Sequence, residues 1–362
     1  MNVLIAAWHL AQFNVGIGRY THALAEAISR VDSDNDYTVL TPRPVPLSLK
    51  NNNVKCLVAP LPLFRRRGWE QIIPFLNGSY DLLHFPYDSC VAWKRGKFVV
   101  TIHDIKPLLF PALHSKRGIA GLIEQWLIGD RISKIDHVLT VSESSKRDIV
   151  HHLGIPVERI TVVYPGVDTA WFSRPRGYPE PDAPYILSVA GTDPTKNVEA
   201  IVRAYARLPT DLRHDVQLVL AGDVKKQPAV QNLVNTLKLG DQVRFTGVVD
   251  DEQLRRLYWG AEVFVFPSLY EGFGFPVVEA MAAGCPVICS KTSSLPEAGG
   301  NAALYVDPHD IDGLAQFMER VLTSSDERAE MVRIGLHHSA KFVWDKTAEE
   351  TIGTYKKVIG RA

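Results

Sequence analysis

The sequence lacks the features that would place it in several large protein classes. It has only 4 cysteines and 4 methionines, and its 40 Lys and Arg residues balance 40 Asp and Glu residues. No apolar run approaches the 18 residues that a membrane-spanning helix requires. Because the net charge is zero, there is no basic surplus to attract nucleic acid, and we expect no such partner.

The cysteines predict neither a metal site nor a disulfide framework. Cys56, Cys90, Cys285 and Cys289 have no metal-like spacing with histidines. Cys285 and Cys289 lie in apolar surroundings, which predicts buried free thiols and a reducing, cytoplasmic compartment. The apolar segment 1–7 has no basic leader, and we interpret it as a first strand rather than a signal peptide.

An acidic run at 32–36 has a superficial likeness to a calcium-binding loop. Tyr37 stands where that loop needs glycine, and Arg43 stands where it needs glutamate. The run follows an expected helix and precedes an expected strand, which favours a solvated turn. We therefore expect no bound metal.

What the sequence does contain is the pattern of an α/β protein with two domains. It has 362 residues, of which 46% are hydrophobic and 22% are charged, as in soluble globular proteins. Short apolar runs alternate with helical patterns, which is typical of parallel sheets covered by helices. The expected strands lie at 3–8, 37–40, 82–85, 98–102, 137–141, 185–189, 216–221, 243–246, 261–266 and 286–290.

The segment 173–184 divides these two alternations. It holds four prolines and a glycine, which exclude regular structure and predict a linker. We thus expect a first domain at 1–172 and a second at 185–344, with a helical tail at about 345–362. A cleft between two such domains would suit a reaction of two substrates.

The second domain contains two acidic residues beside a glycine-rich loop, Glu271 and Glu279. The order around them is strand, glycine loop, helix and strand, and ligands of such sheets bind where strands end and helices begin. Carboxylates accept hydrogen bonds from vicinal hydroxyls, as on a sugar and a ribose. Spacing alone leaves another interpretation open: Glu279 could stabilise its helix N-terminus and Glu271 could be a solvated loop residue.

Three other segments carry polar residues at expected strand ends. Gly16 and Gly18 lie between the first strand and the first helix, where backbone amides can approach a phosphate; a dinucleotide fingerprint or a plain tight turn are the alternatives. Lys196 stands near a helix start, which suggests a bound anion, although an ordinary surface lysine fits too. His103 follows an apolar strand, either as a structural histidine or as a site residue whose tautomer Asp104 would fix.

The string from Glu271 to Glu279 resembles the Glu-x7-Glu signature of retaining glycosyltransferases of family 4. Other segments resemble the family too, and they come in the family's order along the chain before Glu271. They are the Gly16 loop, the His103 turn, segments 140–146 and 164–168, and the Lys196 loop. The resemblance implies the GT-B fold, in which two Rossmann-like domains face each other across a cleft. It also implies that the C-terminal helix crosses back onto the first domain.

The resemblance also implies roles for individual residues. Glu271 would bind hydroxyls of the donor sugar, Glu279 the ribose, and Lys196 the diphosphate, while His103 would contact the sugar near the reaction centre. Thr195 stands where the family commonly has arginine, so one positive charge is missing there. Further donor contacts are implied for Gly16, Gly18, Arg19, Thr195, Val248, Val249, Gly272, Phe273, Gly274 and Phe275, and acceptor contacts for Tyr20 and Asp104.

The implied reaction moves a hexose of mannose or glucose type from a nucleoside-diphosphate sugar to a hydroxyl of a glycan or lipid-linked acceptor. It would retain the anomeric configuration, need no metal or other cofactor, and serve surface polysaccharide synthesis. The Phe275–Pro276 pair favours GDP-mannose over UDP-sugars. Two alternatives remain open: a sugar-nucleotide 2-epimerase, and a non-catalytic sugar-nucleotide-binding subunit, towards which Thr195 leans.

The segment 63–76 mixes arginines with bulky apolar residues. One interpretation is a peripheral contact with the inner face of a membrane, where anionic lipids attract basic residues. In the other interpretation Ile72, Ile73 and Leu76 face the core, and the arginines are simply solvated.

Overall fold

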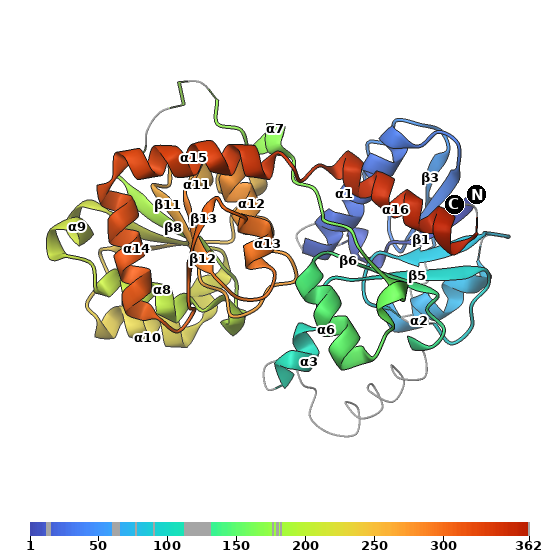
Figure 1. Cartoon of the computed structure of the whole chain (residues 1–362), viewed down its shortest axis with the longest axis horizontal. Coiled ribbons are helices and arrows are strands. Elements are labelled where there is room, and N and C mark those ends of the chain that lie inside the picture. The colour runs from blue at the N-terminus through green and yellow to red at the C-terminus, as the bar shows by residue number, and fades with distance from the viewer. Residues whose placement is uncertain are drawn as a thin grey trace. The chain divides into compact units, whose positions relative to one another are not determined.

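The computed structural model describes residues 1–11, 16–59, 66–76, 78–89, 91–111, 132–175, 177–178, 181 and 183–360. Cys90 and residues 63–65 lie outside this part of the chain. The chain divides into two compact units, one formed by Met1–Gly166 with Phe342–Ala362 and the other by Val167–Lys341. Both units are α/β (Figure 1).

Within the described residues, unit 1 is built on a seven-stranded parallel sheet in the order β3-β2-β1-β4-β5-β6-β7. Its strands are β1 (Asn2–Ala6), β2 (Asp36–Thr41), β3 (Val54–Val58), β4 (Leu82–Phe85), β5 (Lys97–Ile102), β6 (His137–Thr140) and β7 (Ile160–Val162). Its helices include α1 (Gly16–Val31), α2 (Arg66–Ile72), α3 (Lys106–Leu109), α6 (Glu143–Leu153) and α16 (Trp344–Val358). Strands β1 and β4 are apolar over most of their length because helices cover both faces of such a sheet.

Unit 2 repeats this design with a six-stranded parallel sheet, order β10-β9-β8-β11-β12-β13 in the described residues. Its strands are β8 (Tyr185–Val189), β9 (Gln217–Ala221), β10 (Val243–Gly247), β11 (Val263–Phe266), β12 (Val287–Ser290) and β13 (Ala303–Val306). Its helices include α7 (Thr169–Phe172), α8 (Val198–Ala206), α9 (Thr210–Asp215), α10 (Pro228–Thr236), α11 (Asp251–Gly260), α12 (Phe275–Ala282), α13 (Leu295–Gly299), α14 (Ile311–Thr323) and α15 (Ser325–Ser339).

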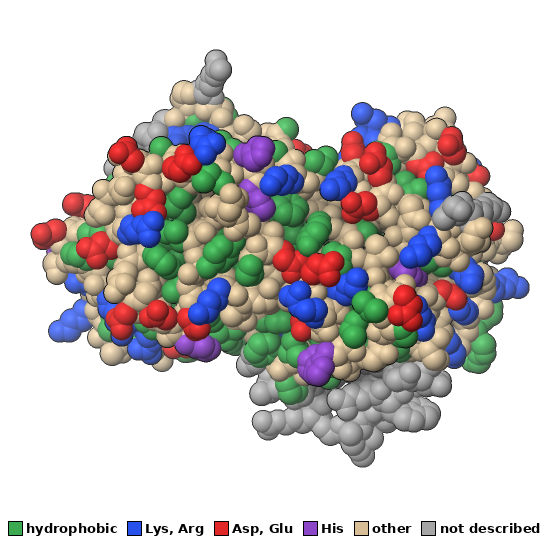
Figure 2. Space-filling view, viewed as in Figure 1, with side chains coloured by type: hydrophobic (Ala, Val, Ile, Leu, Met, Phe, Trp, Pro, Cys, Tyr) green, Lys and Arg blue, Asp and Glu red, His purple; other side chains and the backbone are tan. Residues whose placement is uncertain are grey.

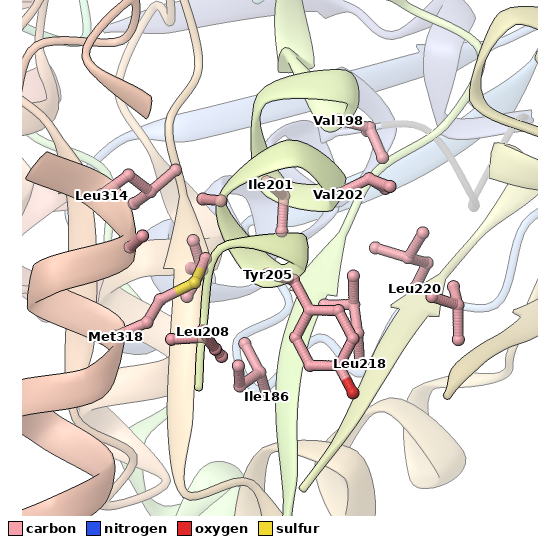
Figure 3. Packing of buried hydrophobic residues seen from close by; sticks show 14 of the residues in the cluster. Ile186, Val198, Ile201, Val202, Tyr205, Leu208, Leu218, Leu220, Leu314 and Met318 are labelled. Atoms are coloured by element: carbon pink, nitrogen blue, oxygen red, sulfur yellow. The ribbon is translucent and has the colours of Figure 1, made fainter. Parts of the chain in front are cut away.

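The core of unit 2 shows why these segments form these elements. Apolar residues at helical spacing on α8, Ile201 and Tyr205, face strand residues such as Leu218, and Met318 of α14 packs beside them (Figure 3). Ile201 and Leu218 are fully buried. Each such side chain contributes about 1.5–3 kcal/mol on burial, so helix and strand periodicities together define the two layers.

The last helix returns to unit 1, as the GT-B expectation requires. Helix α16 lies alongside α1 in Figure 1, and Tyr355, Ala348 and Ile352 are buried on its inner face. The chain arrives so tightly that a Cβ on Gly166 would lie 2.3 Å from the backbone nitrogen of Trp344. The α/β class with two units and the returning helix are thus confirmed.

The division between the units falls earlier than the expected linker. Residues after Gly166 pack on unit 2 because Trp259 Nε1 donates a hydrogen bond of 2.6 Å to the Phe172 carbonyl. The Arg255 guanidinium also lies 4.0 Å from the Trp171 ring centroid and 4.7 Å from that of Trp259. These aromatic contacts hold α7 on α11, which no local pattern around residue 172 indicates.

The sequence left open whether the segment 63–76 faces a membrane or the core. Ile73 is fully buried and Leu76 packs against the core, as the core-facing interpretation of that segment expects, while Phe75 is 55% exposed. Figure 2 shows acidic and basic side chains interspersed over the visible face. No helix in the described part of the chain combines the length and apolar character needed to cross a membrane.

Cys285 and Cys289 are buried free thiols, as predicted.

Candidate active site

The turn after β8 presents Lys196. Asp193 caps a short 3-10 helix, Pro194–Lys196, and its Oδ1 accepts hydrogen bonds from Thr195 N at 2.9 Å and Thr195 Oγ1 at 2.8 Å. Asn197 has a positive φ of 57° and its Nδ2 donates to the carbonyls of Pro267 and Pro308. Thr195 is fully buried and uncharged. Lys196, with its side chain 20% exposed, is therefore the residue of this turn that presents a positive charge.

Lys196 and Glu271 form a salt bridge in unit 2. The distance from Lys196 Nζ to Glu271 Oε1 is 2.7 Å, and the two side chains are 20% and 10% exposed. The same Nζ lies 4.9 Å from the ring centroid of Phe266, the last residue of β11. The structure therefore brings together two of the three residues predicted to be catalytic, at the carboxyl ends of β8 and β11.

The loop that carries Glu271 is held by two serines of the turn after β12. Glu271 N donates to Ser293 Oγ at 2.9 Å, and Ser294 Oγ lies 2.9 Å from the Glu271 carbonyl oxygen and 2.8 Å from that of Phe273. Gly274 has a φ of 113°, and a Cβ there would lie 2.8 Å from Leu295 Cδ2. Neither serine was expected from the sequence; their position just before the Leu-Pro start of α13 was the available signal.

Glu279 lies on α12, whose N-cap is Gly274, and it is 7% exposed. Tyr258 of α11 is fully buried and its hydroxyl donates to Glu279 Oε2 at 3.2 Å. A buried carboxyl group needs such donors, and the sequence did not reveal Tyr258 as the partner of Glu279. The capping alternative for Glu279 does not apply, because the residue lies beyond the first turn.

The predicted base-binding segment follows β10. Val248 is 71% exposed and Val249 is half-buried, and Asp250 then forms a capping box with Gln253 at the start of α11. The expected contacts of this segment with the base are made largely by its backbone, and this role remains a prediction.

In unit 1, His103 follows β5 and is half-buried. Its Nε2 lies 3.0 Å from the Pro86 carbonyl oxygen, which can only accept, so Nε2 carries the proton. The Asp104 carboxylate instead accepts from Lys106 N at 2.9 Å, so the hydrogen bond that fixes the tautomer comes from Pro86 and not, as expected, from Asp104. Desolvation lowers the pKa of His103, which leaves a neutral ring with Nδ1 as a hydrogen-bond acceptor.

The other predicted residues of unit 1 lie on α1, which begins at Gly16. Gly16 and Gly18 are thus in the first turns of the helix and not in a loop before it. Tyr20 is 1% exposed, and its ring centroid lies 4.6 Å from that of His103. Burial raises the pKa of Tyr20 to about 12, so this phenol stays neutral where its ring packs edge-to-face on the imidazole. Arg19 is half-buried in the same turn.

No group of three or more His, Cys, Asp or Glu side chains among the described residues is arranged to hold a metal ion. Each unit instead carries its own set of predicted site groups: a cation, two carboxylates and a glycine loop in unit 2, and a neutral histidine in unit 1. These donors and acceptors suit an anionic, polyhydroxylated ligand.

Two family models match the chain, Glycosyltransferase Family 4 over residues 15–171 and Glycosyl transferases group 1 over residues 171–337. The O-antigen chain mannosyltransferase B of Escherichia coli is 31% identical over 301 residues, which cover 81% of this chain and 77% of that protein. The chain belongs to the family 4, group 1 glycosyltransferases.

Longer relatives and solved structures extend this picture. The serotype-specific mannosyltransferase WbdA of Escherichia coli is 31% identical over 310 residues, which are 80% of this chain, and the chain spans only 36% of its length. HepE of Anabaena, solved in complex with UDP and glucose, superposes with a TM-score of 0.74 at 16% identity. That match covers 99% of this chain and 100% of HepE, and it supports the GT-B fold of this family member.

Proposed function

We propose that the protein is a retaining glycosyltransferase that moves a hexose from a nucleoside-diphosphate sugar to a hydroxyl of a glycan or lipid-linked acceptor. The observation that carries this proposal is the Lys196–Glu271 pair at the start of the glycine loop that leads to Glu279. The similarity to the O-antigen chain mannosyltransferase favours mannose, GDP-mannose as donor, and a role in surface polysaccharide synthesis. We extend the proposal to the inner face of the membrane as the place of action.

In the proposed reaction the bond between sugar C1 and the diphosphate oxygen breaks, and a bond between C1 and the acceptor oxygen forms on the same face of the sugar. Because both events occur on one face, no protein carboxylate is needed as a nucleophile, and because the acceptor proton passes to the departing diphosphate, none is needed as a base. Lys196 neutralises charge that grows on the diphosphate, and fixed charges of this kind commonly give the largest share of the acceleration.

Glu271 orients the donor sugar in this scheme. Its carboxylate accepts hydrogen bonds from sugar hydroxyls, while the Ser293 and Ser294 contacts keep the loop in place. His103 presents Nδ1 as an acceptor because Pro86 holds the proton on Nε2. Orientation by such groups lowers the entropic part of the barrier.

The proposed reaction needs no metal ion, because Lys196 supplies the positive charge that a cation otherwise would. The non-catalytic alternative rests on Thr195, whose hydroxyl is engaged by Asp193 and leaves Lys196 as the one cation of that turn. Binding and product assays in the presence of EDTA test both the metal independence of the reaction and the non-catalytic alternative.

The first test is calorimetric binding of GDP-mannose, GDP, UDP-glucose, UDP-N-acetylglucosamine and UDP, with EDTA present, followed by product analysis with glycan acceptors. We expect one base series to bind at micromolar concentration and an α-linked product to form without metal. An epimerised sugar, an inverted linkage, or binding without turnover would each contradict the proposal.

A further inference from the structure

A buried carboxyl group of unit 1, that of Glu70, lies near residues that follow β1 and β4. Glu70, on α2, is 3% exposed, and Arg66 one turn earlier places its Nε 3.5 Å from Glu70 Oε1. Arg66 Nη1 is 3.1 Å from His9 Nε2. Because a guanidinium only donates, His9 Nε2 must accept, and the neutral His9 ring carries its proton on Nδ1.

Tyr87 completes this group, which we call the Glu70 cluster: His9, Arg66, Glu70 and Tyr87. The Tyr87 ring is fully buried, its centroid lies 4.7 Å from that of His9, and the Arg66 Cζ lies 5.7 Å from it. The neighbouring Pro86 carbonyl binds His103. Since β1, β4 and β5 are adjacent in the sheet, the cluster and His103 share its carboxyl edge.

The groups that face Glu70 act on its charge in opposite directions. Burial raises the pKa of Glu70 to about 7, and the nearby Asp88 also raises it, while Arg66 and the hydroxyls of Ser89 and Tyr87 lower it. The carboxyl group therefore changes charge close to neutral pH. Above that pH the ionised form attracts Arg66, and below it the attraction weakens.

The charges around the cluster indicate the kind of ligand. Asp88 interacts electrostatically with Arg66, His103 and Asp104, so donors and carboxyl groups lie near one another at this edge. A sugar hydroxyl both donates and accepts and can bond to either kind of group. A phosphate would be attracted by Arg66 alone and repelled by the Asp88 and Asp104 carboxylates.

We propose that Glu70 is a positioning residue that holds Arg66 and His9 as a hydrogen-bonding platform for a neutral, hydroxyl-bearing sugar of the acceptor. The inference rests on the proposed function and deepens it by naming the acceptor chemistry and the residues that select it. Glu70 itself does not contact the sugar; Arg66, with its side chain 32% exposed, does.

The test measures transfer from saturating GDP-mannose to methyl α-mannoside, α-mannobiose and mannose 6-phosphate. We expect Glu70→Gln and Arg66→Lys each to raise the KM for the neutral acceptor about tenfold, the loss typical of a charged hydrogen bond. The Kd for GDP-mannose should stay within about twofold. Arg67→Lys, on the exposed side of the same helix, is the matched control and should leave KM unchanged.

The pH profile separates positioning from a purely structural role. In the wild type we expect the acceptor KM to fall as pH rises through about 7, because Glu70 ionises and fixes Arg66; in Glu70→Gln this inflection should vanish. Unchanged KM in both variants, or an inflection that survives in Glu70→Gln, would overturn the positioning role.

Acceptor preference and donor binding distinguish the two levels of failure. Preferred use of mannose 6-phosphate, or transfer to none of the three sugars while GDP-mannose binds, would overturn the neutral-sugar platform. Failure of the wild type to bind any sugar nucleotide would instead overturn the proposed function itself.

Discussion

The Lys196–Glu271 salt bridge joins two groups that would contact different parts of one donor. At 20% and 10% exposure it is only partly screened, so each group is satisfied by the other when no ligand is bound. In the proposed function donor binding opens the pair: the diphosphate takes the place of Glu271 beside Lys196, and sugar hydroxyls take the place of Lys196 beside Glu271. The exchange makes the two residues separable by mutation.

Replacement of Lys196 by alanine should weaken donor binding. The lost charged hydrogen bond is worth about 1.5–3 kcal/mol, so we expect a Kd for GDP-mannose about 10- to 100-fold higher. Calorimetry measures it, with the exposed Lys225→Ala of unit 2 as control. An unaltered Kd would assign the diphosphate to backbone amides instead.

Replacement of Glu271 by alanine should have a different signature. We expect kcat to fall about 100-fold or more, because sugar orientation is lost, while GDP binds at least as tightly, because Lys196 is no longer neutralised. The surface variant Glu199→Ala is the control. Normal turnover, or a weaker affinity for GDP, would contradict this division of roles.

Secondary-structure elements matter to the site mainly through the glycine loop that starts α12. Gly274→Ala should lower the free energy of unfolding by at least about 1–2 kcal/mol, because its φ of 113° is unfavourable for an L side chain and a Cβ would meet Leu295. Gly353→Ala in α16, with open space around it, should instead stabilise by about 0.5–1 kcal/mol. Denaturant titration measures both. Equal changes in the free energy of unfolding for the two variants would contradict this prediction, because they would show that the loop accommodates a Cβ at residue 274.

A second prediction concerns the junction of β4, β5 and α16. His84 is fully buried, with Nε2 2.8 Å from Thr101 Oγ1 and Nδ1 2.6 Å from the Tyr355 hydroxyl. Burial lowers the pKa of His84 to about 3. The unfolded chain therefore binds a proton below about pH 6.5 that the folded chain does not, and stability falls as pH falls from there towards 3.

Between pH 7 and 4.5 this single group should remove roughly 2–3 kcal/mol of stability. Chemical unfolding at the two pH values measures the difference in the free energy of unfolding. In His84→Gln this difference should be smaller by the contribution of His84. Tyr355→Phe, which removes a hydrogen bond but keeps the imidazole, is the matched control and should retain the pH dependence. The same dependence in wild type and His84→Gln would show that His84 is not its source.

At the scale of the whole molecule, the chain leaves unit 1, forms unit 2 and returns as α16 to pack on α1. The stability of unit 1 thus depends on its last residues. A chain that ends at Lys341 should lose at least about 3 kcal/mol of unit 1 stability, because Ile352 and Tyr355 leave the core. Nucleotide binding by unit 2 should persist.

Two-step unfolding, followed by circular dichroism with and without GDP, checks this prediction. Only the transition that GDP does not raise should move in the shortened chain. Unaltered unfolding of both steps would mean that α16 adds little to unit 1.

Much of the site and fold could be predicted from local patterns. The strands around 82–85, 98–102 and 185–189 are apolar over most of their length because both faces are buried, and that leaves a signal in consecutive residues. The Glu271 loop and the Lys196 turn could be identified because each has a charged residue close to glycine or proline in the loop that follows an apolar strand. Helix α16 was expected from its periodicity and its destination from the resemblance.

What the sequence by itself determined is the set of elements and the types of chemical group that their ends carry. Only the tertiary structure decided which of these groups meet: Lys196 with Glu271 across 75 positions, Tyr258 with Glu279, and the Pro86 carbonyl with His103 in place of Asp104. The physical reason is that a hydrogen bond depends on angstrom-scale distance and direction. These are set by the packing of whole helices on a sheet, which leaves no pattern in the residues on either side of a contact.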